Sequence, residues 1–297
     1  SLTRAIRLSV LLSSLGAFLT PMMTAERKIV DPHSVERLWE EMKESRIQNE
    51  IIPDAEGAVN VPPSTPFLTI VMISDTHCDL GEMIEQNLIP YGDVLIHAGD
   101  ITTLGDAPNL TKFNEELGML PHPHKIVIAG NHELGFDPEE DESQRKDKHK
   151  GFGTPEGWKL LTNCTFLNDS STVIDGVKFY GSSWHPLAGF PFYRPRDELK
   201  EKWEAIPDDV DVLITHSPPI GQLDRYLQVE RWGCLYLLEK VEEFRPSLHV
   251  FGHVHDSYGA VKNDHTIFVN AASQKRASED GIKRFNRPLI AYIPMKE

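Results

Sequence analysis

The hydrophobic pattern of the chain is a series of short apolar runs that each end in polar residues. The clearest run covers residues 67–73 (F-L-T-I-V-M-I), which follow a proline-rich stretch and include several β-branched residues. A run of this length and type is typical of a strand buried on both faces of a sheet. Similar runs cover residues 94–97, 125–129, 212–215 and 249–251. We therefore predict five buried strands along the chain.

Helical patterns lie between several of these runs. Residues 109–117 separate the second run from the third, residues 196–203 precede the fourth, and residues 233–244 separate the fourth from the fifth. Alternation of strands and helices favours parallel strand pairing, with helices covering the faces of the sheet. The predicted fold class is therefore α/β.

A second group of shorter strands is predicted in the middle and at the end of the chain. The middle group has Asp175-Gly176 as a hairpin turn and indicates a second, more antiparallel sheet. The short strands that we predict cover residues 165–167, 171–174, 177–180, 259–261, 266–270 and 288–293.

Residues 1–60 are predicted to form an N-terminal extension to a domain of residues 61–297. The extension contains one predicted helix over residues 34–49, with Ser34 as its N-cap. An apolar stretch over residues 8–19 is too short to span a bilayer as a helix. It has the length of a signal-peptide core, and an amphipathic or unstructured extension is the alternative.

Composition and charge narrow the class of protein. The 297 residues include 40% apolar and 25% charged residues, as in a globular protein, and the net charge is −15. An acidic chain without a basic stripe is not expected to bind a nucleic acid polymer. A small phosphate ester is still a possible substrate, because bound metal ions reverse the local charge. The three cysteines are scattered, which favours reduced thiols and a cytoplasmic protein, and secretion is the alternative if residues 1–25 are a signal peptide.

Polar residues follow each of the five apolar runs. Asp75 and His77 are one residue apart, so both side chains point the same way in an extended backbone. A carboxylate and an imidazole on one side can hold a divalent metal, although a capping Asp and an idle His would give the same pair. Ligands collect at the carboxyl ends of strands in open α/β sheets, and recurrence at five strand ends favours the metal. The remaining strand ends carry Gly99-Asp100, Gly130-Asn131-His132-Glu133, His216 and Gly252-His253-Val254-His255.

Taken together, these motifs resemble the calcineurin-like metallophosphoesterase superfamily over residues 67–270. Within the superfamily the chain is similar to the metallophosphoesterase-domain-containing (UPF0046-like) subgroup found in animals, on the segments 73–77, 125–133 and 246–255. The resemblance implies a metallophosphoesterase sandwich of two mixed β-sheets flanked by helices.

The same resemblance implies two divalent metal ions and hydrolysis by in-line attack of a metal-bridging hydroxide. Imidazole and carboxylate ligands suit manganese, with iron, zinc or magnesium as alternatives. The implied ligands are Asp75, His77 and His255 for the first ion, Asn131, His216 and His253 for the second, and Asp100 as the bridge.

His132 matches the catalytic histidine of the family, which protonates the leaving oxygen or hydrogen-bonds the phosphoryl group. His132, Asn131 and His216 are therefore also expected to contact substrate. The chain departs from the family's phosphatase motif at Thr103, where an orienting Asp is expected, and at Leu104, where an Arg grips phosphate. Because a diester carries less charge than a monoester and needs fewer cationic contacts, we expect a phosphodiesterase. The resemblance to the subgroup implies small cyclic nucleotides as its substrates. A catalytically weak nucleotide-binding or scaffold protein is the alternative.

Two further segments contain residues that could contact a substrate or border the site. Residues 181–195 are rich in aromatic side chains, and Trp184, His185 and Arg194 are predicted to form a substrate-stacking wall, with a core-covering loop as the alternative. Residues 137–151 are dense in charge and predict a solvated excursion, with a rim of the site as the alternative.

The other histidines are given no part in the site. His97 and His249 lie within predicted strands and are expected to be packed structural residues. No partner spacing assigns a role to His122, His124, His149 or His265.

Overall fold

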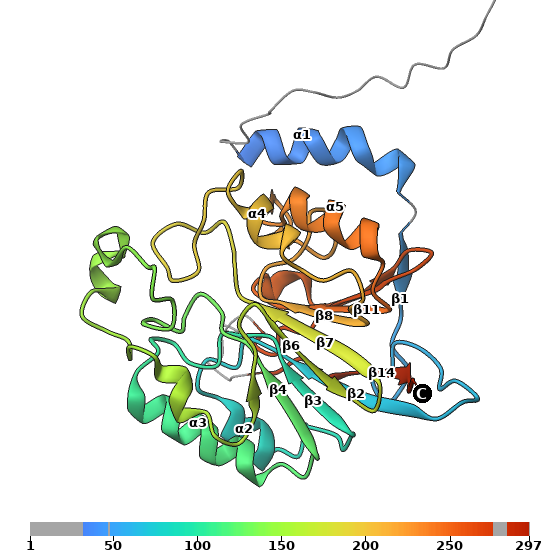
Figure 1. The fold of residues 1–297 in the computed structure, drawn as a ribbon, viewed down its shortest axis with the longest axis horizontal. Coiled ribbons are helices and arrows are strands. Elements are labelled where there is room, and N and C mark those ends of the chain that lie inside the picture. Colours follow the sequence, from blue (N-terminus) through green and yellow to red (C-terminus); the bar gives the residue numbers. More distant parts are fainter. Residues whose placement is uncertain (1–31, 47, 276–283, 297) are drawn as a thin grey trace, which may run out of the picture.

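A computed structural model of the chain describes residues 32–46, 48–275 and 284–296. Two β-sheets pack face to face, and helices cover their outer faces (Figure 1). Helices α2 and α3 lie beside one sheet, and helices α1, α4 and α5 lie on the other side of the molecule. The helices are α1 (Pro32–Met42), α2 (Leu80–Glu85), α3 (Ala107–Met119), α4 (Leu199–Glu204) and α5 (Leu235–Phe244).

The first sheet has five strands in the order β14-β2-β3-β4-β5. Strands β2 to β5 run parallel, and β14 joins the outer side of β2 in the antiparallel direction. Three of the predicted buried runs therefore lie side by side, with their carboxyl ends at one edge. The strands are β2 (Phe67–Ile73), β3 (Val94–His97), β4 (His124–Val127), β5 (Thr165–Phe166) and β14 (Leu289–Pro294).

The second sheet has seven strands in the order β1-β12-β13-β11-β8-β7-β6. Its central strands β13, β11, β8 and β7 are parallel, and its outer pairs are antiparallel. The remaining two predicted buried runs, β8 and β11, are therefore neighbours here. The strands are β1 (Asn49–Ile51), β6 (Ser170–Ile174), β7 (Val177–Ser182), β8 (Val212–Thr215), β11 (Leu248–Phe251), β12 (Gly259–Lys262) and β13 (Ile267–Asn270).

Three expectations about local structure were wrong. Strand β5 was grouped with β6 and β7, but it pairs with β4 in the five-stranded sheet. Ser34 lies inside α1, which begins at Pro32, because the fixed φ of proline suits the first turn of a helix. The same helix ends at Met42, and Asn49 belongs to β1. Helix α2 and the hairpin β9 (Arg225–Tyr226) and β10 (Glu230–Arg231) were not predicted, because elements this short carry no periodic pattern.

One of the two large apolar clusters lies between the two sheets. Leu68, Ile70 and Met72 alternate along β2 and point into it, while Val71 and Ile73 belong to a second cluster that includes the helices. Both faces of β2 are thus buried, which explains why its sequence is apolar throughout. The other inner strands show the same pattern, as with Val212 and Ile214 against Leu213 in β8.

Residues 32–60 pack directly onto the sandwich. Strand β1 extends the seven-stranded sheet by pairing with β12. In α1, Val35 and Trp39 are buried against Ile220 and Leu238. The described part of the chain has no helix with the length and apolar character needed to cross a membrane. The possible leader over residues 1–25 lies outside the described residues.

His97 and His249 are packed structural residues, as expected. Both are fully buried, and each hydrogen-bonds a threonine hydroxyl through Nε2: Thr76 at 2.9 Å and Thr215 at 2.8 Å. The Thr215 hydroxyl donates to the carbonyl of Ser217, so His249 must be the donor in its own bond. Burial lowers the pKa of His249 to about 3, so the ring stays neutral in the folded protein.

This burial predicts an acid-sensitive contribution to stability. Because the folded pKa lies below the unfolded value of about 6.5, the unfolded chain binds an extra proton as the pH falls below that value. His249 then favours unfolding, and the effect grows until the pH reaches the folded pKa. Urea unfolding at pH 7.5 and pH 5.0 should show that His249→Gln loses about 2 kcal/mol less stability between these pH values than the wild type. Equal losses of stability in the variant and the wild type would show that His249 becomes protonated in the folded protein by pH 5.0.

Candidate metal centre

The loops at the carboxyl ends of five strands meet at one edge of the sandwich. Loops after β2, β3 and β4 come from the five-stranded sheet, and loops after β8 and β11 come from the seven-stranded sheet. A parallel bridge between Ser74 and Ala272 joins the two sheets at this edge. All seven predicted metal ligands are carried by these loops.

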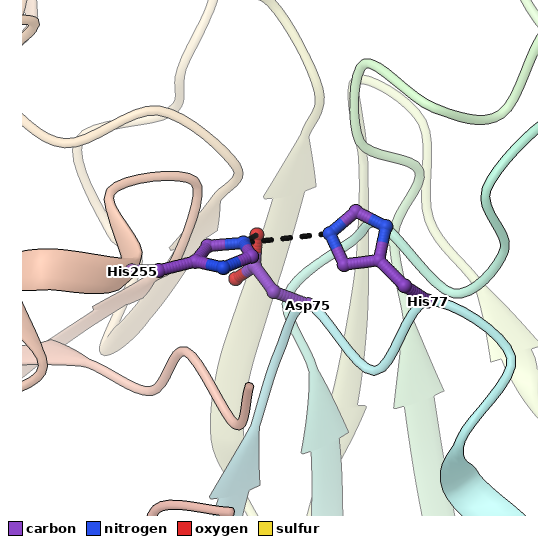
Figure 2. Close-up of side chains that lie close together, drawn as sticks. All are labelled: Asp75, His77 and His255. Atoms are coloured by element: carbon purple, nitrogen blue, oxygen red, sulfur yellow. Dashed lines mark hydrogen bonds and ion pairs between the residues drawn. The ribbon is translucent and has the colours of Figure 1, made fainter. Parts of the chain in front are cut away.

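Asp75, His77 and His255 form the first cluster. Figure 2 shows the two imidazole rings on either side of the Asp75 carboxylate. His255 Nε2 lies 3.2 Å from Asp75 Oδ1 and 3.4 Å from His77 Nε2. One ligand atom from each residue lies within 4.8 Å of the others, so a single metal ion could contact all three.

Asn131, His216 and His253 lie on the other side of Asp100. His216 Nε2 is 3.0 Å from Asn131 Oδ1, and the rings of His216 and His253 are 4.9 Å apart. Asp100 lies between the two groups, with Oδ1 3.4 Å from His216 Nε2 and Oδ2 3.7 Å from His77 Nε2. The carboxylate is thus placed as a bridge would be.

Hydrogen bonds to backbone carbonyls show that this donor set suits a cation. His216 Nδ1–H donates to the carbonyl of Ala98 at 2.9 Å, and His77 Nδ1–H donates to the carbonyl of Thr102 at 3.2 Å. Nε2 is therefore the nitrogen that faces the site in both rings, and in His216 it lies 3.0 Å from the carbonyl oxygen of Asn131. Burial would lower the pKa of His216, but attraction to Asp100 outweighs it and raises the pKa to about 9, so this nitrogen favours a positive charge on its site-facing side. Fixing the second ring nitrogen in this way is the usual arrangement for metal-binding histidines.

The charges of the site agree with a cation site. Burial would raise the pKa of Asp75, but attraction to His255 outweighs it and holds the pKa below its ordinary value. Burial acts likewise on Asp100, where attraction to His216 and His132 prevails and keeps the pKa well below the ordinary value. Burial, with the charge of His216, lowers the pKa of His253 well below its usual value. The site therefore holds two buried carboxylates and a neutral imidazole at neutral pH.

Four of the seven predicted ligands have left-handed backbone conformations, so the extended backbone expected at Asp75 and His77 is wrong. Asp75, His77, Asp100 and His253 have φ angles of +53°, +42°, +54° and +67°. This conformation is uncommon for residues other than glycine and concentrates at functional sites. Close packing supports it, because a Cβ at Gly130 would collide with the Asp100 carboxylate and one at Gly252 with the Asp75 carboxylate.

Glu133 holds the loops in place and was not singled out from the sequence. Its buried carboxylate accepts hydrogen bonds from the backbone N–H groups of Gly130 (2.7 Å), Thr102 (2.9 Å) and Asp100 (3.0 Å). Burial, together with the charge of Asp100, raises the pKa of Glu133 to about 7. The signal in the sequence was an acidic residue directly after Asn131-His132. The sequence alone does not distinguish an acid that holds the backbone in place from one that binds metal.

His132 is half-buried beside the first cluster. Its Nδ1–H donates to the backbone carbonyl of Thr103 at 2.7 Å, and its ring lies edge-on to His77 at 4.9 Å. Its own backbone N–H donates to Asp100 Oδ1 at 2.9 Å. Thr103 stands where the family's motif has an Asp side chain, and here its main-chain carbonyl accepts the hydrogen bond from the His132 ring.

The three aromatic-segment residues predicted to bind substrate all have structural partners. Trp184 is buried, donates to Asp169 at 2.7 Å, and is covered by the cations of Arg194 and Lys202. Arg194 donates to Glu139 at 2.5 Å and lies 3.7 Å from Asp137. His185 donates through Nε2 to the carbonyl of Pro191 and accepts at Nδ1 from Leu187 N–H.

Ring contacts surround His253, whose ring nitrogens have no hydrogen-bond partner among the described residues. His185 stacks on its ring at 5.8 Å with an interplanar angle of 22°, and Trp232 lies 5.3 Å away. Trp232 is in turn stacked on Tyr226 of the β9–β10 hairpin at 4.0 Å. Neither Trp232 nor Tyr226 was predicted near the site, because the hairpin that carries them has no sequence pattern.

Residues 68–257 match the family model described as calcineurin-like phosphoesterase. The chain belongs to this family. A UPF0046 protein of Caenorhabditis elegans is 47% identical over 94% of this chain and 94% of its own length. Human metallophosphoesterase domain-containing protein 1 is 44% identical over 79% of this chain and 74% of its own length. The recognition of the family and of its UPF0046-like subgroup is confirmed.

Solved structures of metallophosphoesterases show distant similarity to this calcineurin-like phosphoesterase. Phosphopantetheinyl hydrolase from Mycobacterium tuberculosis aligns with a TM-score of 0.45 and 15% identity over 73% of this chain and 95% of that chain. A purple acid phosphatase from yellow lupin aligns with a TM-score of 0.44 and 13% identity over 71% of this chain and 45% of that chain. The sandwich of two mixed sheets predicted for this calcineurin-like phosphoesterase is the fold described above.

The left-handed backbone at His253 predicts different outcomes for two substitutions. His253→Gly and His253→Ala both remove the imidazole and should weaken binding of one of two Mn²⁺ ions in isothermal titration calorimetry. In metal-free protein, the Gly variant should be more stable than the Ala variant by about 1 kcal/mol in urea unfolding, because only glycine adopts this conformation without strain. Two tight Mn²⁺ sites in both variants would contradict the ligand assignment, and equal stabilities would contradict the strain.

Proposed function

We propose that this protein is a metal-dependent phosphodiesterase that hydrolyses small phosphodiesters, with cyclic nucleotides as the substrates of first choice. The observation that carries the proposal is the convergence of carboxylate, amide and imidazole groups from five strand ends beside the half-buried His132, which also lies within reach of His77 and Asp100. Family membership supports phosphoester hydrolysis in general. The narrower substrate class rests on the site's charges.

In this proposal two metal ions are held by residues from both sheets. When bound, they supply Lewis-acid stabilisation of charge on the phosphoryl oxygens and a water of lowered pKa. The mixed imidazole and carboxylate donors favour manganese, with iron, zinc or magnesium as alternatives. The ligands would be Asp75, His77 and His255 for one ion and Asn131, His216 and His253 for the other, with Asp100 shared.

His132 would act on the leaving oxygen of the ester. Its Nδ1–H is fixed on the carbonyl of Thr103, so only Nε2 is available to the substrate. In the imidazolium form, the proton on Nε2 passes to the leaving oxygen as the ester bond breaks, while the proton on Nδ1 stays in place. The Thr103 carbonyl thus orients the ring and supports its positive charge, without the desolvation cost of a further buried carboxylate.

The distribution of positive charge favours a diester over a monoester. Leu104 stands where the related phosphatases have a phosphate-gripping Arg, and Arg194 is neutralised by Asp137 and Glu139. A diester carries one negative charge fewer than a monoester dianion and requires fewer cationic contacts. A site with leucine at position 104 and with Arg194 neutralised therefore suits the diester better.

Removal of metal should abolish turnover. Chelator-treated protein should not hydrolyse bis(p-nitrophenyl) phosphate, and added Mn²⁺ should restore the rate. A panel of monoesters and diesters, including cyclic nucleotides, should then be assayed with manganese, iron, zinc and magnesium, with phosphate or nucleotide release as the readout. Full activity in protein shown to be metal-free by elemental analysis would rule out the two-metal proposal, and a preference for monoesters would rule out the diester class.

His132→Ala should lower kcat by about 10²- to 10³-fold, in line with the loss of general acid help. Because His132 is not a proposed ligand, Mn²⁺ content and the melting temperature should change little. His122→Ala is a matched control, since His122 is also in a short loop and packs on Tyr91, at the opposite end of the sheet. An unchanged kcat in correctly folded His132→Ala would instead favour a scaffold or nucleotide-binding protein.

A further inference from the structure

A second histidine of unassigned role packs against His132. His149 belongs to the charge-dense segment 137–151, and its side chain is buried, with a relative exposure of 4%. Its ring lies 6.2 Å from the ring of His132 and 5.0 Å from that of Phe190. Phe190 in turn lies 5.4 Å from His132, so the three rings form one contiguous group. Part of the segment predicted as a solvated excursion therefore borders the candidate site.

The hydrogen bonding of His149 is unusual within this protein. Its Nδ1 is buried without a partner, as are the Nδ1 atoms of His97, His122 and His249. Each of those three rings is anchored through Nε2, to Thr76, to the carbonyl of Pro90 and to Thr215 respectively. Within the described residues, His149 has no hydrogen bond at either ring nitrogen. Because Nδ1 is shielded from solvent, Nε2 is the nitrogen of His149 that is left for a ligand.

The segment that carries His149 is held in place by hydrogen bonds of buried side chains. Arg145 is 3% exposed, donates twice to Glu140 at 2.6 and 2.7 Å, and donates to the carbonyl of Phe152 at 2.7 Å. Asp137 accepts a hydrogen bond from the backbone N–H of Phe192 at 2.9 Å. This bond connects the start of segment 137–151 to the loop that carries Phe190. A residue meant to contact a ligand is expected to be supported in this way.

We propose that His149 is a substrate-binding residue, whose Nε2 hydrogen-bonds an oxygen of the phosphoester on the side of His132 away from the metal ligands. The ring contacts support this, because His132 contacts both His77, at 4.9 Å, and His149, at 6.2 Å. Substrate then provides a hydrogen-bond partner for Nε2, which has none among the described residues. This inference deepens the proposed phosphodiesterase function and rests on it.

The test compares His149→Ala and His149→Gln with His122→Ala in Mn²⁺-loaded protein. Hydrolysis of bis(p-nitrophenyl) phosphate gives kcat and KM, and calorimetry gives the affinity for inorganic phosphate, whose fourth oxygen occupies the leaving-group position. His149→Ala should lower kcat/KM and phosphate affinity by about tenfold each, the usual effect of losing one such hydrogen bond. His149→Gln, which keeps an N–H donor, should recover part of both, and Mn²⁺ affinity should be unchanged.

His122→Ala removes another buried imidazole with an unpaired Nδ1, so it reports the cost of losing packing alone. It should lower the melting temperature and leave kcat/KM and phosphate affinity at wild-type values. If His149→Ala behaves in the same way, His149 is only a packing residue and the proposal is wrong. If the wild type hydrolyses no ester, the proposed function fails, and the phosphate affinities of the two His149 variants still decide whether this residue contacts the ligand.

Discussion

The candidate site depends on one buried carboxylate that makes no proposed contact with metal or substrate. Glu133 accepts backbone N–H groups from the loop after β3 and from the loop after β4, so it fixes the main chain on both sides of Asp100 and Asn131. Asp100 has a left-handed backbone, and Gly130 is crowded by the Asp100 carboxylate. The Glu133 side chain holds the backbone of both residues. Because both carboxyl oxygens of Glu133 accept backbone N–H groups, one buried side chain fixes two loops at a strained position. Without Glu133, the loops that carry Asp100 and Asn131 would lose these three hydrogen bonds, and the ligands would be held together less firmly.

The outline of the site follows from the sequence because it depends on strand periodicity. Asp75, Asp100, Asn131, His216 and His253 each follow an apolar run, and the carboxyl ends of parallel strands must meet, so their proximity could be predicted. The ring contacts of Trp232 and His149 could not, because they depend on how aperiodic loops fold back onto the sheets. For Trp184 the structure adds what the sequence did not show, since its buried ring lies under Arg194 and Lys202, and its contact with substrate stays a prediction.

Thr103 shows why a departure from a family motif is a weak guide to lost function. The sequence has a threonine where an orienting carboxylate is expected, so the orientation of the His132 ring could not be predicted from it. In the structure the carbonyl of the same residue receives the Nδ1–H of His132 at 2.7 Å. A main-chain oxygen is present whatever the side chain, so the backbone conformation of the loop, and not residue identity, decides whether the ring is oriented.

The division of the ligands between two sheets has a consequence for how the site is assembled. Asp75, His77, Asp100 and Asn131 come from the five-stranded sheet, and His216, His253 and His255 come from the seven-stranded sheet. Neither half of the chain holds a complete set, so the site exists only while the apolar inner faces of the sheets are in register. A shift of one sheet against the other by a single residue repeat, about 3.3 Å, exceeds the tolerance of a coordination shell. The close packing of side chains such as Ile70 and Val212 between the sheets is therefore as much a determinant of ligand geometry as the ligands themselves.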